Sequence, residues 1–265
     1  MTLDTDVSRR RNVRRDGLAD GASGAEAVAI CEAARGRTLN SLADALYRRR
    51  HIIKGRMADA KAGGAGTSPI AKALGGDFHC LHPAVRRHYA EPTIHVSGTM
   101  DFIYVKSSIM PLAHVSHRLF HAPVPHGGID VEVSVHNWVD DAGAMHWVRM
   151  FFKNASFPKD VTFKSRMVYS GDHTIIEFTR FGLGVESTLS VDVEGSLVHD
   201  IRKYVVRMPL LGLILRFPTW LTPFGGGCTQ EIGETEDSFR VEFEMTHLIF
   251  GRTVAYTGRC GFVSR

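Results

Sequence analysis

Hydrophobic and polar residues alternate along most of the chain beyond about residue 93. The clearest case is the segment 238–247, in which Phe239, Val241, Phe243 and Met245 share one face and mostly charged residues occupy the other. A period of two places successive side chains on opposite faces of a β-strand. The segment is therefore predicted to be a strand with one core face and one solvent face.

The same alternation recurs in ten segments separated by turn residues. These predicted strands are 94–105, 129–138, 145–153, 160–170, 173–181, 185–193, 196–207, 227–234, 238–247 and 252–263. Short links of the hairpin kind favour antiparallel pairing. Because open edges are a liability, we expect the sheet to curl up. The fold class is mainly β (α+β), an antiparallel curled sheet or β-barrel of about ten strands with a few short helices.

Three short helices are expected beside the strands. The first covers 69–75, and the second covers 81–89 with Pro83 in its first turn. The third covers 111–121, and its apolar residues recur at helical spacing. They are Leu112, Val115, Leu119 and Phe120. This stripe is predicted to face the core.

The N-terminal part differs from the sheet region in charge. Residues 1–56 carry 12 Lys or Arg and 7 Asp or Glu, whereas residues 57–265 carry 20 and 21. We therefore predict a basic, poorly ordered arm and linker over 1–67 and a barrel-like domain over 68–265. A functional alternative for the arm is an electrostatic tether to an anionic surface. Met57, which precedes a Gly/Ala-rich stretch, is an alternative translation start.

Composition narrows the protein class. Of the 265 residues, 44% are hydrophobic, which is enough for a substantial core. No run of about 18 apolar residues predicts a membrane span, and about the first 30 residues lack the apolar core of a secretory signal. The four cysteines form no CxxC pair. We expect a cytoplasmic protein, and the lack of basic excess in the sheet region argues against nucleic acid as its partner.

Arg149 is the most informative polar residue of the predicted strands. It lies between Trp147 and Phe151 on one largely apolar face. A guanidinium group in such a place must be paired or solvated. One interpretation is an anchor for the carboxylate or phosphate of a ligand. The other is an internal ion pair, with Glu177 or Glu231 as the partner.

Other candidate chemistry is weaker. His114, His117 and His121 share one stripe of the third helix, and His79 and His82 flank a cysteine. Neither group has the remaining ligands of a metal site nearby, so no metal is predicted. Phosphate-loop, dinucleotide and nucleophile-elbow motifs are absent from the sequence. No cofactor is therefore predicted, and whether the protein is an enzyme stays open.

The segment 208–224 is strongly apolar but interrupted by Pro209, Pro218 and Pro223. It is too short and too interrupted to span a bilayer. Two functional interpretations are a lid over the mouth of a cavity and an insertion that contacts a membrane surface. The structural alternative is a buried plug that closes one end of the barrel.

Several short motifs follow one another in a familiar order. They are the run Leu81–Tyr89, the strand Trp147-Val148-Arg149-Met150-Phe151, the Leu/Pro-rich segment before Pro223, then Glu231, Phe239, Val241 and Phe243, and Tyr256-Thr257-Gly258. Over about 70–264 they resemble an uncharacterised bacterial family, domain of unknown function four-one-six-six. The resemblance implies no established activity. Members are sometimes joined to short-chain or saccharopine-type dehydrogenase domains, which implies a role near small-molecule or lipid metabolism.

The leading hypothesis is a module that binds a hydrophobic small molecule or lipid-like ligand with an acidic or polar end. Trp147 and Phe151 would contact the apolar body and Arg149 the head, while Glu231 and Tyr256 would line the same interior. One alternative is an enzyme that uses a histidine or glutamate in that cavity. Another is a structural or interaction module with a fully packed barrel.

Overall fold

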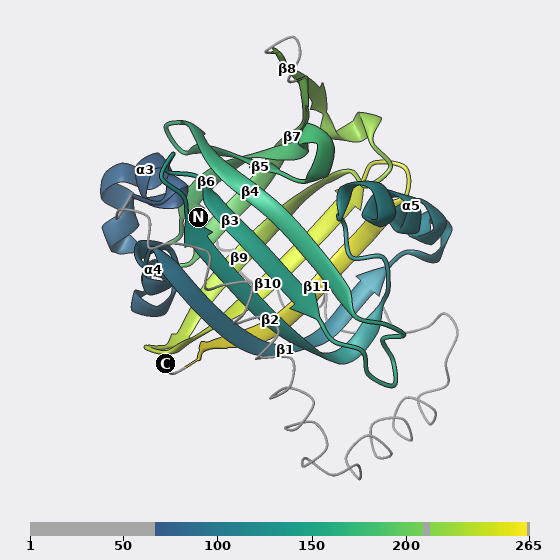
Figure 1. Cartoon of the computed structure of the whole chain (residues 1–265), viewed down its shortest axis with the longest axis horizontal. Helices are drawn as coiled ribbons and strands as arrows, with labels where there is room; N and C mark the ends of the chain where they lie inside the picture. Colours follow the sequence, from purple (N-terminus) through teal and green to yellow (C-terminus); the bar gives the residue numbers. More distant parts are fainter. Residues whose placement is uncertain (1–66, 209–212, 264–265) are drawn as a thin grey trace, which may run out of the picture. The chain divides into compact units, whose positions relative to one another are not determined.

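Ten strands form a closed antiparallel barrel, and an eleventh is attached at one rim (Figure 1). The computed structural model describes residues 67–208 and 213–263. The strands are β1 (Thr93–Val105), β2 (Gly128–Val139), β3 (Met145–Phe151), β4 (Val161–Gly171), β5 (Thr174–Phe178), β6 (Leu183–Val191), β7 (Leu197–Met208), β8 (Leu213–Pro218), β9 (Gly226–Thr235), β10 (Ser238–His247) and β11 (Gly251–Phe262). The ten predicted strands are confirmed, with ends that shift by a few residues. The predicted arm and the alternative start at Met57 lie outside the described residues, apart from Thr67.

The barrel follows chain order almost throughout. Each strand from β1 to β7 pairs with the next, β9 to β11 do the same, and β11 pairs with β1 to close the ring. β7 is the exception, because residues 197–201 pair with β9 whereas residues 203–208 pair with β8 on the same edge. The predicted antiparallel barrel is therefore confirmed, and β8 continues the sheet beyond its rim.

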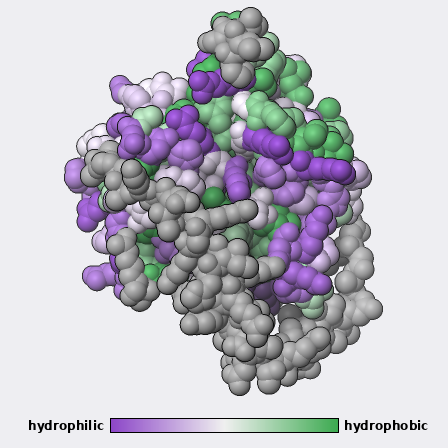
Figure 2. All heavy atoms as spheres, in the orientation of Figure 1, coloured by the Kyte–Doolittle hydropathy of each residue, from purple (hydrophilic) through white to green (hydrophobic). Residues whose placement is uncertain are grey.

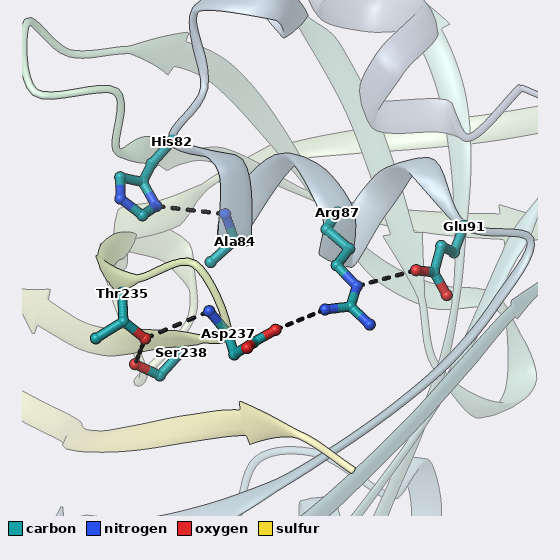
Figure 3. Close-up of polar contacts among 7 residues, drawn as sticks. All are labelled: His82, Ala84, Arg87, Glu91, Thr235, Asp237 and Ser238. Carbon is teal, nitrogen blue, oxygen red and sulfur yellow. Dashed lines mark hydrogen bonds and ion pairs between the residues drawn. The ribbon is translucent and has the colours of Figure 1, made fainter. Parts of the chain in front are cut away.

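Two short helices lie at one end of the barrel. They are α3 (Pro69–Leu74) and α4 (Pro83–Ala90), joined by a 3-10 helix. His82 caps α4, since its Nδ1 accepts a hydrogen bond from the backbone of Ala84 (Figure 3). Arg87 then pairs with Glu91 at 3.0 Å and with Asp237, in the β9–β10 turn, at 2.7 Å. The pair with Asp237 links α4 to the β9–β10 turn at this end of the barrel.

The helix α5 (Met110–Phe120) lies at the opposite end (Figure 1). Its position confirms the predicted helix, but the predicted core stripe is wrong. Leu112, Val115 and Leu119 are 42%, 54% and 47% exposed. The face that packs on the barrel carries the small residues Ala113 and Ser116 instead, because small side chains let the helix approach the rim closely.

The apolar segment after β7 does not close the barrel. All residues of β8 are exposed, as is Trp220 in the 3-10 turn that follows, and the strand projects from the rim (Figure 1). The buried-plug interpretation is therefore wrong for the described part of the segment. The reason is that, among the described residues, β8 pairs with β7 alone and no second layer of structure covers either face.

Within residues 67–208 and 213–263, no helix is both long enough and apolar enough to cross a bilayer.

Candidate functional site

The interior of the barrel holds a cavity of about 190 Å³. Its wall is mostly aliphatic and aromatic, but a cluster of ionisable side chains enters it from the end covered by α4. These residues are His88, Tyr89, Arg149, Glu177, His199 and Glu231. A hollow interior does not match the fully packed barrel of the structural alternative.

All five residues of the predicted site line this cavity. Trp147, Arg149 and Phe151 come from β3, Glu231 from β9 and Tyr256 from β11. The alternation along β3 places its three residues on the same inner face. The structure thus brings the predicted residues together, and ligand contact by them stays a prediction.

Arg149 lies between two aromatic rings. Its guanidinium carbon is 4.2 Å from the ring centroid of Trp147 and 4.7 Å from that of Phe163. Its Nη1 donates hydrogen bonds to Glu177 Oε1 at 3.0 Å and to Ser165 Oγ at 3.4 Å. The Ser165 hydroxyl donates to the same glutamate oxygen. Of the two partners considered from the sequence, the ion pair is therefore with Glu177.

The pair of Arg149 and Glu177 is charged on both sides. Burial opposes both charges, but attraction to Arg149 and hydrogen bonds from Ser165 and Arg149 outweigh it and lower the pKa of Glu177. Attraction to Glu177 likewise outweighs burial and raises the pKa of Arg149. The side chains keep 15% and 19% of their surface exposed, and both line the cavity. Both hydrogen bonds that Arg149 makes with described residues come from Nη1, so Nε and Nη2 remain as donors for a ligand.

Glu231 forms the second half of the cluster. Its Oε1 accepts a 2.6 Å hydrogen bond from the hydroxyl of Tyr89, whereas Oε2 has no hydrogen-bond partner among the described residues. Burial raises the pKa of Glu231 to about 7. The carboxyl group is thus poised between its protonated and ionised forms near neutral pH.

Two neutral histidines complete the wall. His88 is 2% exposed, and its ring lies 4.8 Å from that of Tyr89 and 5.3 Å from that of Trp147. Neither of its ring nitrogens has a partner among residues 67–208 and 213–263, nor does Nε2 of His199. Burial lowers the pKa of His88 to about 3 and that of His199 to about 4. Both imidazoles are therefore uncharged at neutral pH and can hydrogen-bond a ligand.

Tyr256 lies on the same wall of the cavity. Its ring stacks on Phe243 with 4.7 Å between the centroids. Burial raises the pKa of its hydroxyl to about 12. Tyr256 is therefore a neutral hydrogen-bonding group at this site.

Sequence reasoning missed His88, Tyr89 and His199 as site residues. A signal existed for His199, because it alternates with Leu197 in a predicted strand. The face that α4 turns toward the barrel has no comparable signal. It depends on how the helix docks, and His88 and Tyr89 enter the cavity only through that docking.

The α5 histidines that were considered as metal ligands contact different rings. The rings of His114 and His126 are 4.5 Å apart, and those of His117 and His121 are 6.0 Å apart. His117 Nδ1 also lies 3.1 Å from the carbonyl oxygen of Pro123. Across the described residues, no group of three or more His, Cys, Asp or Glu side chains is placed to hold a metal ion.

Comparison with known proteins gives a family but no activity. The model of a family described as Domain of unknown function (DUF4166) matches residues 81–260, which confirms the resemblance seen in the motifs. Rv2717c from M. tuberculosis is 9% identical, with 72% of this chain and 99% of that chain covered and a TM-score of 0.38. A trans-AT PKS dehydratase domain from Brevibacillus brevis is 9% identical, with 76% and 92% covered and a TM-score of 0.21. No curated protein matches the chain.

Proposed function

The chain belongs to this family of unknown function, and for this member we propose a module that binds a hydrophobic molecule with an acidic end inside the barrel. The observation that carries the proposal is Arg149, a largely buried cation that faces an apolar cavity and has part of its donor fork unused by the described residues. A planar fork of this kind suits a carboxylate or phosphate. Trp147 and Phe151 would contact the apolar body of the ligand.

The size of the cavity limits the ligand. At about 190 Å³ it exceeds the cavity of about 150 Å³ that accommodates benzene in an engineered protein. It is smaller than the roughly 300–1,000 Å³ of sites for drug-sized molecules. We therefore infer a compact aromatic acid, or the end of a longer acyl chain.

Glu231 would make binding of an acid depend on pH. A ligand carboxylate beside the cluster favours the protonated carboxyl group, whose Oε2 can then donate a hydrogen bond to it. Binding would thus take up a proton wherever Glu231 is ionised in the free protein. The affinity should be full below pH 7 and should fall as the pH rises through about 7, the pKa of Glu231.

Binding of 2-naphthoate, a compact aromatic acid, tests the proposal. Isothermal titration calorimetry at pH 6 should show that 2-naphthoate binds. The neutral analogue 2-naphthamide should bind more weakly or not at all. Arg149→Lys keeps a charge opposite Glu177 but loses the fork, so we expect about tenfold weaker binding of 2-naphthoate.

The matched control is Arg166→Lys, on the same sheet but outside the cavity, where Arg166 lies 3.6 Å from Asp140. This variant should bind like the wild type. Absence of binding, or equal affinities in the wild type and Arg149→Lys, would contradict the proposed function.

Glu231→Gln tests the proton linkage. In the wild type, affinity for 2-naphthoate should fall by up to about tenfold per pH unit above pH 7, because a proton must be taken up. The amide of the variant keeps a donor and does not titrate, so its affinity should be nearly constant from pH 6 to pH 9. Parallel pH profiles of the two proteins would rule out Glu231 as the linked group.

The same carboxyl group supports the enzyme alternative. A glutamate with a pKa of about 7 in an apolar cavity, beside two neutral imidazoles, suits general acid–base catalysis. Incubation of the protein with a cell extract of metabolites, with Glu231→Gln as the control, separates the two functions. A compound consumed by the wild type alone would favour the enzyme, whereas a compound retained unchanged would favour the binding module.

A further inference from the structure

Exposed hydrophobic residues gather at the end of the barrel that carries α5 and β8. They come from α5, from β8 and the turn that follows it, from the β5–β6 and β10–β11 turns and from the adjoining ends of β1 and β2. Among the described residues, only Tyr169 and Val193 of the large exposed hydrophobics lie at the opposite end. Figure 2 shows hydrophobic surface on the side where Figure 1 places β8 and α5.

The segments that connect the strands also differ in charge between the two ends. The segments that connect strands at the α5 end, with β8 included, contain a single acidic residue, Asp160. Their basic residues are Lys106, Arg118, Lys153, Lys159, Arg180 and Arg216. The hairpin turns at the α4 end, residues 140–144, 172–173, 192–196 and 236–237, carry seven Asp or Glu and no Lys or Arg.

Basic and apolar side chains alternate on the α5 end. Arg118 lies between Val115 and Leu119 on the exposed part of the helix. Arg180 lies over the ring of Phe181, with 4.6 Å from the guanidinium carbon to the ring centroid. Arg216 is already paired with Glu186 at 2.7 Å, so the excess of positive charge rests on the other basic residues.

The exposed side chains at this end project outward, unlike those of a concave groove that binds a protein partner. Leu248 and Ile249, at the tip of the β10–β11 turn, are 88% and 82% exposed, and Trp220 is 57% exposed beside them, with its carbonyl oxygen 3.2 Å from His247. Aliphatic tips flanked by an interfacial tryptophan and by Lys or Arg are the composition of a surface that enters the headgroup layer.

We propose that the α5 end of the barrel docks on the surface of an anionic phospholipid bilayer. The aliphatic tips and Trp220 enter the boundary between headgroups and acyl chains, while Arg118, Arg180 and their basic neighbours contact the phosphates. The acidic turns at the α4 end then face away from the bilayer. This inference goes beyond the proposed function, because docking needs no ligand in the cavity.

Sedimentation of the full chain with phospholipid vesicles tests the proposal. Vesicles of phosphatidylglycerol and phosphatidylcholine should bind the protein, and vesicles of phosphatidylcholine alone should bind it much more weakly. The double variant that carries Leu248→Ser and Ile249→Ser should bind the anionic vesicles at least about tenfold more weakly, since buried apolar area is lost. The charge variant, which carries both Arg118→Glu and Arg180→Glu, should also bind these vesicles at least about tenfold more weakly.

Matched controls lie at the opposite end. Val193→Ser and Tyr169→Ser remove exposed apolar side chains there, and Lys72→Glu reverses an exposed charge. All three should bind vesicles like the wild type. Every variant keeps residues 1–66, so binding through the basic N-terminal sequence would leave all of them alike and would overturn the proposal.

Two further results would also overturn it. One is absence of binding to the anionic vesicles. The other is loss of binding in the charge variant but not in the Leu248/Ile249 variant, which would indicate electrostatic adsorption to the headgroups without entry of the aliphatic tips. Affinity for 2-naphthoate, measured on the same variants without vesicles, should be unchanged. A failure of bilayer docking is thereby distinguished from a failure of the ligand site.

Discussion

Arg149→Ala is expected to lower the free energy of unfolding by about 3–5 kcal/mol. The substitution removes the cation that faces Glu177 at 3.0 Å and leaves a carboxylate in an apolar barrel. It also removes the group packed between Trp147 and Phe163. A charge left buried without its partner costs far more than the net contribution of the intact pair.

A double variant separates the effect of losing the ion pair from the cost of leaving Glu177 charged and unpaired. Arg149→Met with Glu177→Leu removes both charges and keeps most of the volume, so its stability should lie within about 1–2 kcal/mol of the wild type or above it. Arg166→Ala is the control, because it breaks a half-exposed pair with Asp140 and should cost less than about 1 kcal/mol. Urea unfolding at pH 7 measures all three. If the double variant is as unstable as Arg149→Ala, the buried charge is not the cause.

The alternation of side chains and the turns between them were sufficient to predict an antiparallel curled sheet or barrel. They identified ten strands and placed Trp147, Arg149 and Phe151 on one inner face. The strand β8 was missed because residues 213–218 carry no alternation. A continuous apolar run indicates burial, yet here it is exposed, since β8 pairs with a single strand beyond the rim.

The choice between Glu177 and Glu231 as the partner of Arg149 could not be made from the sequence, because it depends on register. Arg149 is opposite Phe163 in β4, and the carboxylate reaches it from β5, one strand further. Only the pairing of Met167 with Glu177 places that glutamate beside Ser165 and Arg149. Glu231 enters from β9, on a different part of the wall, where the hydroxyl of Tyr89 in α4 donates a hydrogen bond to it. The sequence contains both glutamates but not the distances between strands.

Acid should destabilise the protein through His88. The loss of unfolding free energy should approach the loss expected for Arg149→Ala. Burial lowers the pKa of His88 to about 3, with smaller contributions from Arg149 and His199. Below pH 6.5 the unfolded chain, with a histidine pKa of about 6.5, binds a proton at this residue, whereas His88 of the folded protein stays unprotonated. The stability that neutral His88 contributes is present above pH 6.5 and is lost as the pH falls from 6.5 toward 3. The loss reaches about 3 kcal/mol at pH 4.5 and about 4 kcal/mol at pH 3.

Glu231 acts in the opposite direction. Its pKa of about 7 lies above the value in the unfolded chain, so the stability linked to its protonated form is present below pH 4.5 and is lost as the pH rises through 7. His199, with a pKa of about 4, reinforces His88. The pH profile of the wild type therefore sums opposing effects, and a variant is needed to isolate one group.

His88→Phe isolates the acid effect. A phenyl ring can occupy the stack between Tyr89 and Trp147, and His88 has no hydrogen-bond partner among the described residues to lose. Between pH 7 and pH 4.5 the wild type should lose about 3 kcal/mol more stability than this variant, as measured by urea unfolding at each pH. Phe157→Leu, a change at a fully buried neutral residue, should lower stability equally at both pH values. If His88→Phe and the wild type lose stability in parallel, the histidine is protonated or solvated in the folded protein, and the neutral wall inferred for the cavity is wrong.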